Sequence, residues 1–397
     1  TFMSELASTP LNPGRPLWQF HLVENYVGGA ALIMRIHHCI ADGMALVQVF
    51  LSLTDASREG RPSSGKPGRW KQRLAPEATV FQRLLEPARE GLEFASQVGQ
   101  RMRREACRVL QNPSVAGNYA LDAAETVAEL VRTLALPNDP VTRFRGRLGV
   151  RKKVAWAEPL PLEEVKAVSK AFGCTVNDVL IAAVTGALRQ YMLDCGDEAA
   201  ALVDIRATVP VNLRSLDHAK ELGNQFGLVF LLLPLSLDSP LERLFAINAR
   251  MQELKTSKQA TVTLGVLAAL GMGPPVLQKP VVDILSQKAS AVLTNVPGPT
   301  GPLYLAGSEL KEMMFWVPQN GSVGVGISIL SYNGKVFFGL ITDRRLVAEP
   351  GDIISRFGQE FQKFLYLSLM LPLDGRSDEE FARDLLAYSI QTGADTR

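Results

Sequence analysis

Apolar residues in this chain gather in two kinds of run, and the two kinds alternate along most of the sequence. Continuous apolar runs bounded by Gly, Pro or polar residues are typical of buried strands, whereas apolar positions three and four residues apart are typical of helices that bury one face. The continuous runs predict strands, several of which lead into loops, at residues 28–41, 151–160, 201–215, 225–235, 289–299 and 323–343. The helically spaced runs predict helices at residues 43–53, 161–173, 175–192, 240–258, 259–273 and 350–368.

Turn and capping signals sharpen several of these boundaries. Asn333 and Gly334 stand between two apolar runs, a pair that favours a tight hairpin turn. Gly173 follows one predicted helix as a stop, and Thr175 begins the next as its N-cap, with Asp178 three residues later as a variant of the capping box. Because strands and helices interleave and a hairpin is present too, we expect an α/β protein with mixed sheets.

The chain between residues 55 and 140 has a different character. Residues 55–77 are polar and rich in Gly, Pro and Ser, which indicates a loop or linker. Residues 78–110 and 121–135 are charged and amphipathic, which predicts surface helices. Beyond about residue 372 the chain is polar again, as is typical of a loose tail.

Composition limits the classes of function. The chain has 397 residues, enough for two lobes, and its net charge of +2 argues against nucleic-acid binding. Its four cysteines include no C-x-x-C pair or metal-ligand spacing, and no signal peptide is visible, so we expect a cytoplasmic protein without a metal. The longest uncharged runs, 222–237 and 259–278, are broken by Gly, Pro or Asn and do not predict a membrane span.

The stretch "HHCIADG", residues 37–43, holds two of the four histidines of the chain. In an extended strand His37 and His38 would point to opposite faces, so only one would look into a cavity. Asp42 precedes the predicted helix, where it could cap a backbone N–H or pair with an arginine, and Gly43 permits a tight turn or a close approach.

Two buried histidines and a helix cap are the ordinary interpretation of such a pattern. The position of H-H-x-x-x-D-G between an apolar strand and a helix favours a catalytic site instead. An imidazole suits general-base work because its ordinary pKa, about 6.5, is close to neutral pH. No G-x-S-x-G serine motif accompanies it, and Cys39 would point away from its neighbour His38. We therefore expect direct base catalysis, without a covalent enzyme intermediate.

With these residues the chain resembles the HHxxxDG acyltransferases, which include condensation domains and chloramphenicol acetyltransferase. Further segments resemble motifs of the bacterial wax ester synthase/diacylglycerol acyltransferase family, in the same order and over about residues 1–370. These segments are "PLNPGRPLWQF" (10–20), "TVNDVL" (175–180), "VPVNLR" (209–214), "GNQF" (223–226), "TNVPGP" (294–299) and "LSYNGKVFFGLITD" (330–343).

The resemblance implies a two-lobed, chloramphenicol acetyltransferase-like fold with an active-site tunnel between the lobes. This chain begins after the family's first strands and helices, so we expect the N-terminal part of the first lobe to be absent from it. The expected units are residues 1–60, the remaining N-terminal lobe with the HHxxxDG motif; residues 61–140, a variable linker with surface helices; residues 141–372, the C-terminal lobe; and residues 373–397, a polar tail.

The resemblance also implies roles for individual residues. His38 is expected to be the general base, with His37 and Asp42 in supporting roles. Arg214 is the expected partner of Asp42, and the alternative is that it merely faces solvent after a strand. Asn177 fits either a substrate contact or a helix-start hydrogen bond, and Asp178 fits a cap better than a reactant.

Asn295, in an apolar surrounding, fits either the satisfaction of buried backbone groups or the polarisation of a carbonyl. The run "VTRFRGRLGVRKK", residues 141–153, holds six basic and no acidic residues. Either it is a solvated linker, or it attracts coenzyme A phosphates or an anionic membrane. With the helices at 78–110 it is the expected place of peripheral contact with the inner membrane or lipid inclusions.

By resemblance the expected activity is O-acyl transfer from acyl-CoA, as a co-substrate and not a cofactor, to a long-chain fatty alcohol, a diacylglycerol or both. One alternative is a condensation-type or polyketide-associated acyltransferase that takes carrier-bound acyl groups. Another is a lipid-binding protein without catalysis, against which the complete HHxxxDG motif argues.

Overall fold

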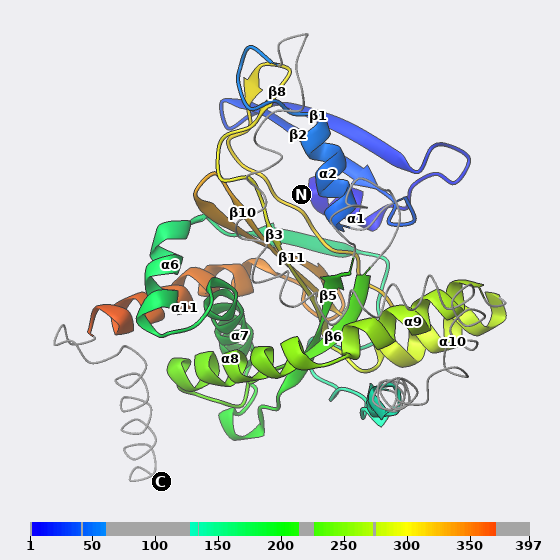
Figure 1. Cartoon of the computed structure of the whole chain (residues 1–397), viewed down its shortest axis with the longest axis vertical. Coiled ribbons are helices and arrows are strands. Elements are labelled where there is room, and N and C mark those ends of the chain that lie inside the picture. The colour runs from blue at the N-terminus through cyan, green and yellow to red at the C-terminus, as the bar shows by residue number, and fades with distance from the viewer. Residues whose placement is uncertain are drawn as a thin grey trace, which may run out of the picture.

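The computed structural model describes residues 2–40, 43–60, 128–133, 135–213, 226–272 and 275–370. Its labelled helices are α1 (Phe2–Ser8), α2 (Gly43–Ser52), α6 (Leu162–Ala171), α7 (Val176–Asp194), α8 (Pro240–Thr256), α9 (Gln259–Met272), α10 (Pro275–Ser286) and α11 (Gly351–Leu369) (Figure 1). Its strands are β1 (Trp18–Tyr26), β2 (Gly29–Ile36), β3 (Lys152–Trp156), β4 (Leu160–Pro161), β5 (Ile205–Asn212), β6 (Phe226–Leu233), β7 (Ala291–Pro297), β8 (Tyr304–Leu305), β9 (Ser308–Glu309), β10 (Val325–Tyr332) and β11 (Lys335–Asp343).

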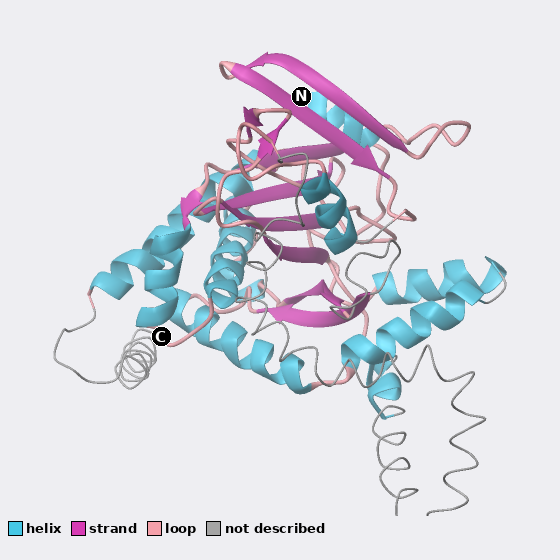
Figure 2. Cartoon of the chain, turned by 45° about the horizontal axis from the view of Figure 1, so that its top comes forward, coloured by secondary structure: helices cyan, strands magenta, loops and turns pink. Residues whose placement is uncertain are grey.

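One mixed sheet organises most of these elements. Its strand order is β3-β11-β10-β7-β5-β6, with β4 added to β11. β10 and β5 each pair with β7 in parallel, and the remaining pairs are antiparallel. Figure 2 shows these strands stacked as one layer with helices beside it. The expected α/β fold with mixed sheets is confirmed.

Helices α6, α7, α8 and α11 cover one face of this sheet (Figure 1). Alternate residues of β10, Val325, Ile327 and Ile329, point into the main core with Phe338 and Leu340 of β11. Most of α7 is buried there, which explains its continuous apolar sequence. The strand residues between those of the main core therefore point to the opposite face of the sheet.

Helix α2 packs on the opposite face. Leu51 of α2 belongs to a second cluster with Leu330, Phe337 and Val296, whose side chains alternate with those of the main core. The N-terminal elements are thus attached to the face of the sheet that the large helices leave open.

The edge strand β6 is covered by α9. The backbone N–H groups of Leu228 and Phe230 donate to Thr263 Oγ1 and Gln259 Oε1, each at 2.7 Å. A Cβ at Gly227 would lie only 1.9 Å from the backbone oxygen of Ala260, so glycine is needed for this close approach. The apolar run that begins at Gln259 is therefore a helix that closes a sheet edge.

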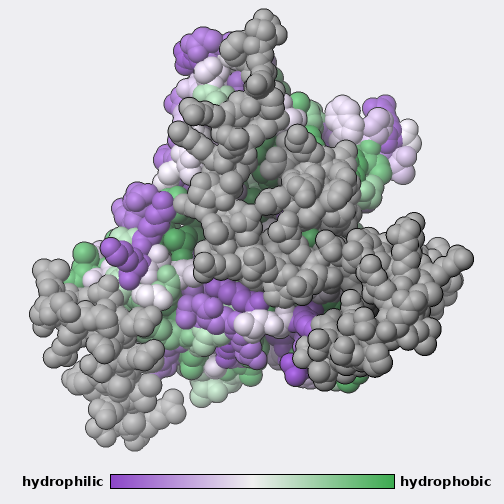
Figure 3. Space-filling model, in the orientation of Figure 1, coloured by the Kyte–Doolittle hydropathy of each residue, from purple (hydrophilic) through white to green (hydrophobic). Residues whose placement is uncertain are grey.

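Strands β1 and β2 form a separate antiparallel ribbon, in register from Trp18↔Ile36 to Glu24↔Ala30, with a bulge before Tyr26↔Gly29. One of its faces carries apolar side chains that stay partly exposed, with Trp18 at 50%, Phe20 at 46% and Leu22 at 64%. In Figure 3 the upper right of the molecule, beside this ribbon, shows apolar residues next to polar ones.

Most sequence-based boundaries agree with the structure to within a few residues. Gly173, with φ of 61°, ends α6, Asn333 and Gly334 form the β10–β11 turn with positive φ, and the helix before Pro274 is confirmed as α9. Residues 28–40 form a strand that runs into a turn, as expected of 28–41, with β2 ending at Ile36, but the expected burial is wrong, because every residue of β2 is partly or fully exposed. The helices at 78–110, most of 121–135, the linker from residue 61 and the tail 373–397 lie outside the described residues.

No single helix within the described ranges has the length and apolar composition that crossing a bilayer requires; only α6 and α7 together, bent by 98°, reach them.

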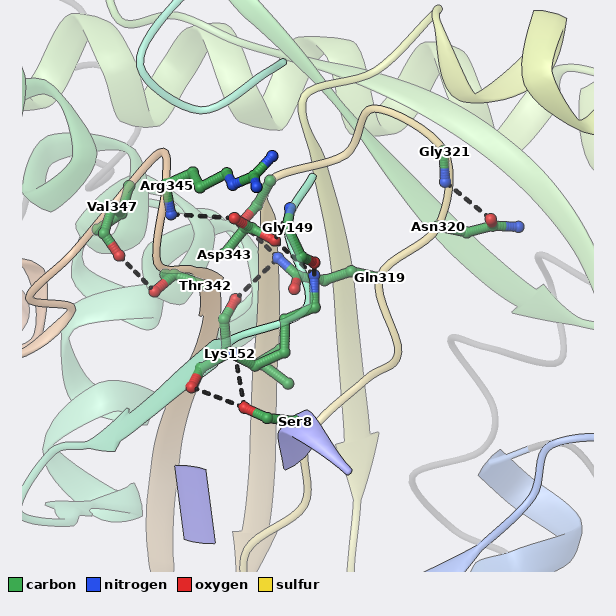
Figure 4. Close-up of polar contacts among 12 residues, drawn as sticks. Ser8, Gly149, Lys152, Gln319, Asn320, Gly321, Thr342, Asp343, Arg345 and Val347 are labelled. Carbon is green, nitrogen blue, oxygen red and sulfur yellow. Dashed lines mark hydrogen bonds and ion pairs between the residues drawn. The ribbon is translucent and has the colours of Figure 1, made fainter. Parts of the chain in front are cut away.

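A buried carboxylate joins the start of β3 to the end of β11 (Figure 4). Asp343 Oδ2 accepts hydrogen bonds from Lys152 Nζ at 2.7 Å and Gly149 N at 2.8 Å, and Oδ1 accepts from Arg345 N at 3.0 Å. Burial alone would raise the pKa of Asp343, but these hydrogen bonds and the Lys152 charge outweigh it, so the pKa is lowered. The same lysine is tied to α1, because Lys152 N donates to Ser8 Oγ at 2.7 Å.

A carboxylate with a lowered pKa stabilises the fold above its unfolded pKa, about 3.9, and this contribution is lost as the pH falls through the folded pKa. We therefore expect Asp343→Asn to lower the free energy of unfolding at pH 7, by about 2 kcal/mol. The difference from wild type should shrink progressively below about pH 4. Urea denaturation at a series of pH values measures it, and a difference that grows toward low pH would contradict the assignment.

Helix α7 makes room for a buried ion pair between α8 and α11. Arg243 Nη2 donates to Glu360 Oε2 at 2.7 Å, and the two side chains are only 2% and 4% exposed. A Cβ at Gly186 of α7 would stand 2.0 Å from that same Oε2. Gly186 is therefore required by the ion pair and not by a turn.

Gly186→Ala should lower the free energy of unfolding by about 3 kcal/mol, because it displaces a buried, hydrogen-bonded charge. Gly358→Ala on α11 is the matched control: its added Cβ meets nothing within 4 Å. We expect that variant to be as stable as wild type or more so by up to about 1 kcal/mol. Equal urea midpoints for the two variants would show that the contact with Glu360 is not tight.

Candidate active site

The two histidines lie in a turn directly after β2. His37 N donates to Leu17 O at 2.9 Å, and Ile40 N donates to His37 O at 3.0 Å, which closes the turn. His37 is exposed, and its Nδ1 accepts a hydrogen bond from Cys39 N at 3.2 Å. This contact holds His37 against the backbone of its own turn.

His38 has different surroundings. It is half-buried, and its ring meets the ring of Phe226 with centroids 5.9 Å apart and planes at 70°. The two histidines therefore differ as expected, but the reason given by strand alternation is wrong, since the strand ends before either of them.

The ring of Phe226 locates His38 relative to the main sheet. β5, β7 and β10 run parallel, so their carboxyl ends meet at one edge of the sheet. Phe226 begins β6 at this edge, opposite Asn212, the last residue of β5. His38 thus stands where the carboxyl ends of three parallel strands converge, a common place for ligands in α/β proteins.

Two of the predicted residues meet at the same edge. Asn295, near the end of β7, donates through Nδ2 to Asn177 Oδ1, in the first turn of α7, at 2.8 Å. Both side chains are half-buried. β5 and β7 are paired only at residues 207–208 and 291–292, so the two strands separate before they reach this edge. The amide pair therefore links β7 to α7 beside the part of the sheet that is open.

Asp178 acts as the predicted cap. Its Oδ2 accepts from Thr175 N at 2.9 Å, and Thr175 Oγ1 accepts from Asp178 N at 3.2 Å, so the capping box is confirmed. Asn248 of α8 donates to the same Oδ2 at 2.8 Å. With its side chain fully buried, Asp178 fixes the start of α7 and hence the position of Asn177.

The remaining predicted site residues are less informative. Asp42 and Arg214 lie outside the described residues, so their pairing stays a prediction. Gly43 is the first residue of α2, its φ is not positive, and a Cβ there would meet nothing within 4 Å. The described part of the chain therefore makes no close approach at Gly43, and an approach of a ligand there stays a prediction.

The basic run at residues 141–153 is mostly neutralised within the fold. Its charged side chains pair with distant groups: Arg143 with Asp197, Arg145 with the backbone oxygen of Asp139, Lys152 with Asp343, and Lys153 with Glu349. Among the described residues of the run, Arg147 and Arg151 are exposed and have no such partner, so an anion-binding role for the run stays a prediction that rests mainly on these two arginines.

Sequence reasoning missed Phe226 and Asn248, whose roles depend on contacts between distant segments. It also missed Thr294 and Ser328, which pair in register on the face toward α2 and whose buried hydroxyls have no hydrogen-bond partner among the described residues. The sequence does mark these two residues, because each is a hydroxyl residue within an otherwise apolar strand.

A metal site and a reactive thiol at Cys174 have little support in the described part of the chain. Among these residues, no group of three or more His, Cys, Asp or Glu side chains could hold a metal ion. Burial raises the pKa of the Cys174 thiol to about 12, so it is not a nucleophile at neutral pH.

Comparison with known proteins agrees with this architecture. Residues 1–180 match the model of the wax ester synthase/diacylglycerol acyltransferase catalytic domain, and residues 222–364 match the C-terminal domain of the same family. A Mycobacterium tuberculosis protein named as a diacylglycerol O-acyltransferase is 29% identical over 385 residues, which cover 91% of this chain and 70% of that protein. A second one from the same species is 25% identical over 88% of this chain and 72% of its own length.

The solved structure of the wax ester synthase/diacylglycerol acyltransferase from Marinobacter aquaeolei VT8 has the same fold. It superposes with a TM-score of 0.58 at 22% identity, covering 93% of this chain and 76% of that one. The expected two-lobed, mixed α/β architecture is thereby confirmed, while the tunnel between the lobes stays a prediction. The chain belongs to the wax ester synthase/diacylglycerol acyltransferase family and is an acyltransferase.

Proposed function

We propose that this acyltransferase moves a long-chain acyl group from acyl-CoA to the hydroxyl of a fatty alcohol or a diacylglycerol, with His38 as the general base. The observation that carries the proposal is the place of His38, half-buried on Phe226 at the edge where three parallel strands end. The names of the family and of its relatives support the two acceptor classes.

The proposed reaction has one chemical step that needs a base. A nitrogen of the His38 imidazole takes the proton of the acceptor hydroxyl while its oxygen attacks the thioester carbonyl carbon. The tetrahedral intermediate collapses with cleavage of the C–S bond, and the imidazolium returns its proton to the CoA thiolate. Ester and free CoA leave, and the histidine is neutral again. Base catalysis contributes about 10²- to 10⁴-fold, so positioning of the two substrates supplies much of the rest.

The surrounding residues support this step by position. His37 is exposed, and its Nδ1 accepts a hydrogen bond from Cys39 N that holds the turn. Asp178 fixes the start of α7, and through it the Asn177–Asn295 pair beside the open part of the sheet. An amide in this place could also donate to a substrate carbonyl. No step of the proposed reaction requires a cofactor, and acyl-CoA enters only as a co-substrate.

Loss of the imidazole should remove transfer without unfolding the protein. The assay mixes palmitoyl-CoA with hexadecanol or dioleoylglycerol and follows thiol release and neutral lipid. We expect His38→Ala to lower kcat at least about 100-fold with an unchanged Tm, and the control His37→Ala to lower it less than about tenfold. An active His38→Ala enzyme would contradict the assignment. Activity restricted to carrier-protein thioesters would replace acyl-CoA as donor.

Variants of the two capping-box residues, Thr175 and Asp178, test whether Asp178 has only a structural role or also takes part in the reaction. Thr175→Ala and Asp178→Asn each weaken the cap, so each should lower the free energy of unfolding by about 1 kcal/mol. If Asp178 only holds the helix, both folded variants should keep kcat within about threefold of wild type. A large loss of kcat in Asp178→Asn alone would give this carboxylate a part in the chemistry.

A further inference from the structure

Two loops at the far edge of the sheet bring together arginines from distant parts of the sequence. Residues 147–151 lead into β3, and residues 344–345 follow β11. The loops are joined by a backbone hydrogen bond from Arg344 N to Arg151 O at 3.0 Å. We call Arg147, Arg151, Arg344 and Arg345 the basic surface. It lies where β10 begins, at the edge opposite to the one that holds His38.

The charges around these loops do not balance. Both neighbouring carboxylates are already paired, Asp343 with Lys152 at 2.7 Å and Glu349 with Lys153 at 3.4 Å. The side chains of the basic surface are all exposed, and within the described part of the chain they take part in no ion pair or side-chain hydrogen bond. Four guanidinium groups are therefore left without a counter-charge from the described part of the protein.

The local structure holds the two loops that carry these arginines against each other. A Cβ at Gly149 would stand 2.9 Å from Arg345 Nε, so this glycine lets the arginine side chain lie directly on the neighbouring loop. Figure 4 shows Arg345 beside Gly149 and Asp343. Like charges held near one another repel, and an anionic partner relieves this repulsion.

An apolar side chain stands among the arginines. Val150, between Arg147 and Arg151 in sequence, is 76% exposed. Guanidinium groups around a protruding aliphatic side chain fit an anionic membrane, where the cations meet phosphates and the apolar group enters the interface. A free nucleotide phosphate would gain no favourable contact from the exposed Val150 side chain.

We propose that the basic surface docks this enzyme on lipid surfaces that contain anionic headgroups. The proposal replaces the sequence-based assignment to residues 141–153, since two of the four arginines come from the end of β11. Docking is independent of the proposed acyl-transfer chemistry, and binding can be measured without turnover.

The test is co-sedimentation of the full chain with phosphatidylcholine vesicles that contain either no or 30% phosphatidylglycerol. We expect binding only with phosphatidylglycerol, weakening as NaCl is raised from 50 to 400 mM. Each Arg→Gln change in the basic surface should lower the partition coefficient roughly fivefold, so that Arg344→Gln with Arg345→Gln lowers it about 25-fold. Val150→Ser should lower it severalfold, and the equally prominent Val141, 83% exposed, serves as its control in Val141→Ser.

A lysine variant with the same change in charge as the fourfold Arg→Gln variant of the basic surface separates that surface from net charge. Changing the exposed Lys170, Lys279, Lys311 and Lys335 to Gln should leave the partition coefficient within twofold of wild type. Equal losses in the lysine and arginine variants, or none in the arginine variants, would overturn the proposal. So would release of bound protein by 1 mM CoA together with a raised KM for acyl-CoA in the arginine variants, which would make the surface a nucleotide-phosphate site.

Discussion

The account depends on one geometric constraint, the common direction of β5, β7 and β10. Because these strands run parallel, their carboxyl ends meet at a single edge, and everything assigned to the candidate site gathers there. The ring of His38 reaches this edge through Phe226, and the Asn177–Asn295 bond reaches it from α7. The N-terminal ribbon is joined to the C-terminal sheet at the point where chemistry is proposed.

Most of the local structure could be predicted because its causes are local. Neighbouring residues determine the capping box of α7, the turn at Asn333 and the end of α6 at Gly173. Strand β1 was missed because its apolar residues alternate with polar ones and stay partly exposed, so no continuous apolar run marks it. Helix α10 was missed because Pro280 lies inside it, where proline usually ends a helix.

The site was predicted less completely, for a physical reason. The H-H-x-x-x-D-G motif named the histidines, but the partner of His38 is 188 positions further along the chain, and no local pattern identifies Phe226 as that partner. Contacts with distant residues also decide which charges of residues 141–153 are paired. Counting the cations of this run suggested an anion-binding segment, yet four of the six have partners in the fold, and the outward-facing surface recruits Arg344 and Arg345 from elsewhere. Composition counts charges, whereas topology decides which of them remain unpaired.

The central claim is that a hydroxyl acceptor is bound with its oxygen at the His38 imidazole. A crystal structure of the chain with a long-chain alcohol and a non-reactive thioether analogue of acyl-CoA tests it most directly. The account predicts the alcohol oxygen within about 2.6–3.2 Å of a His38 ring nitrogen, at the carboxyl edge of β5, β7 and β10. An alcohol bound elsewhere, with the His38 ring still packed on Phe226 and out of its reach, would contradict it.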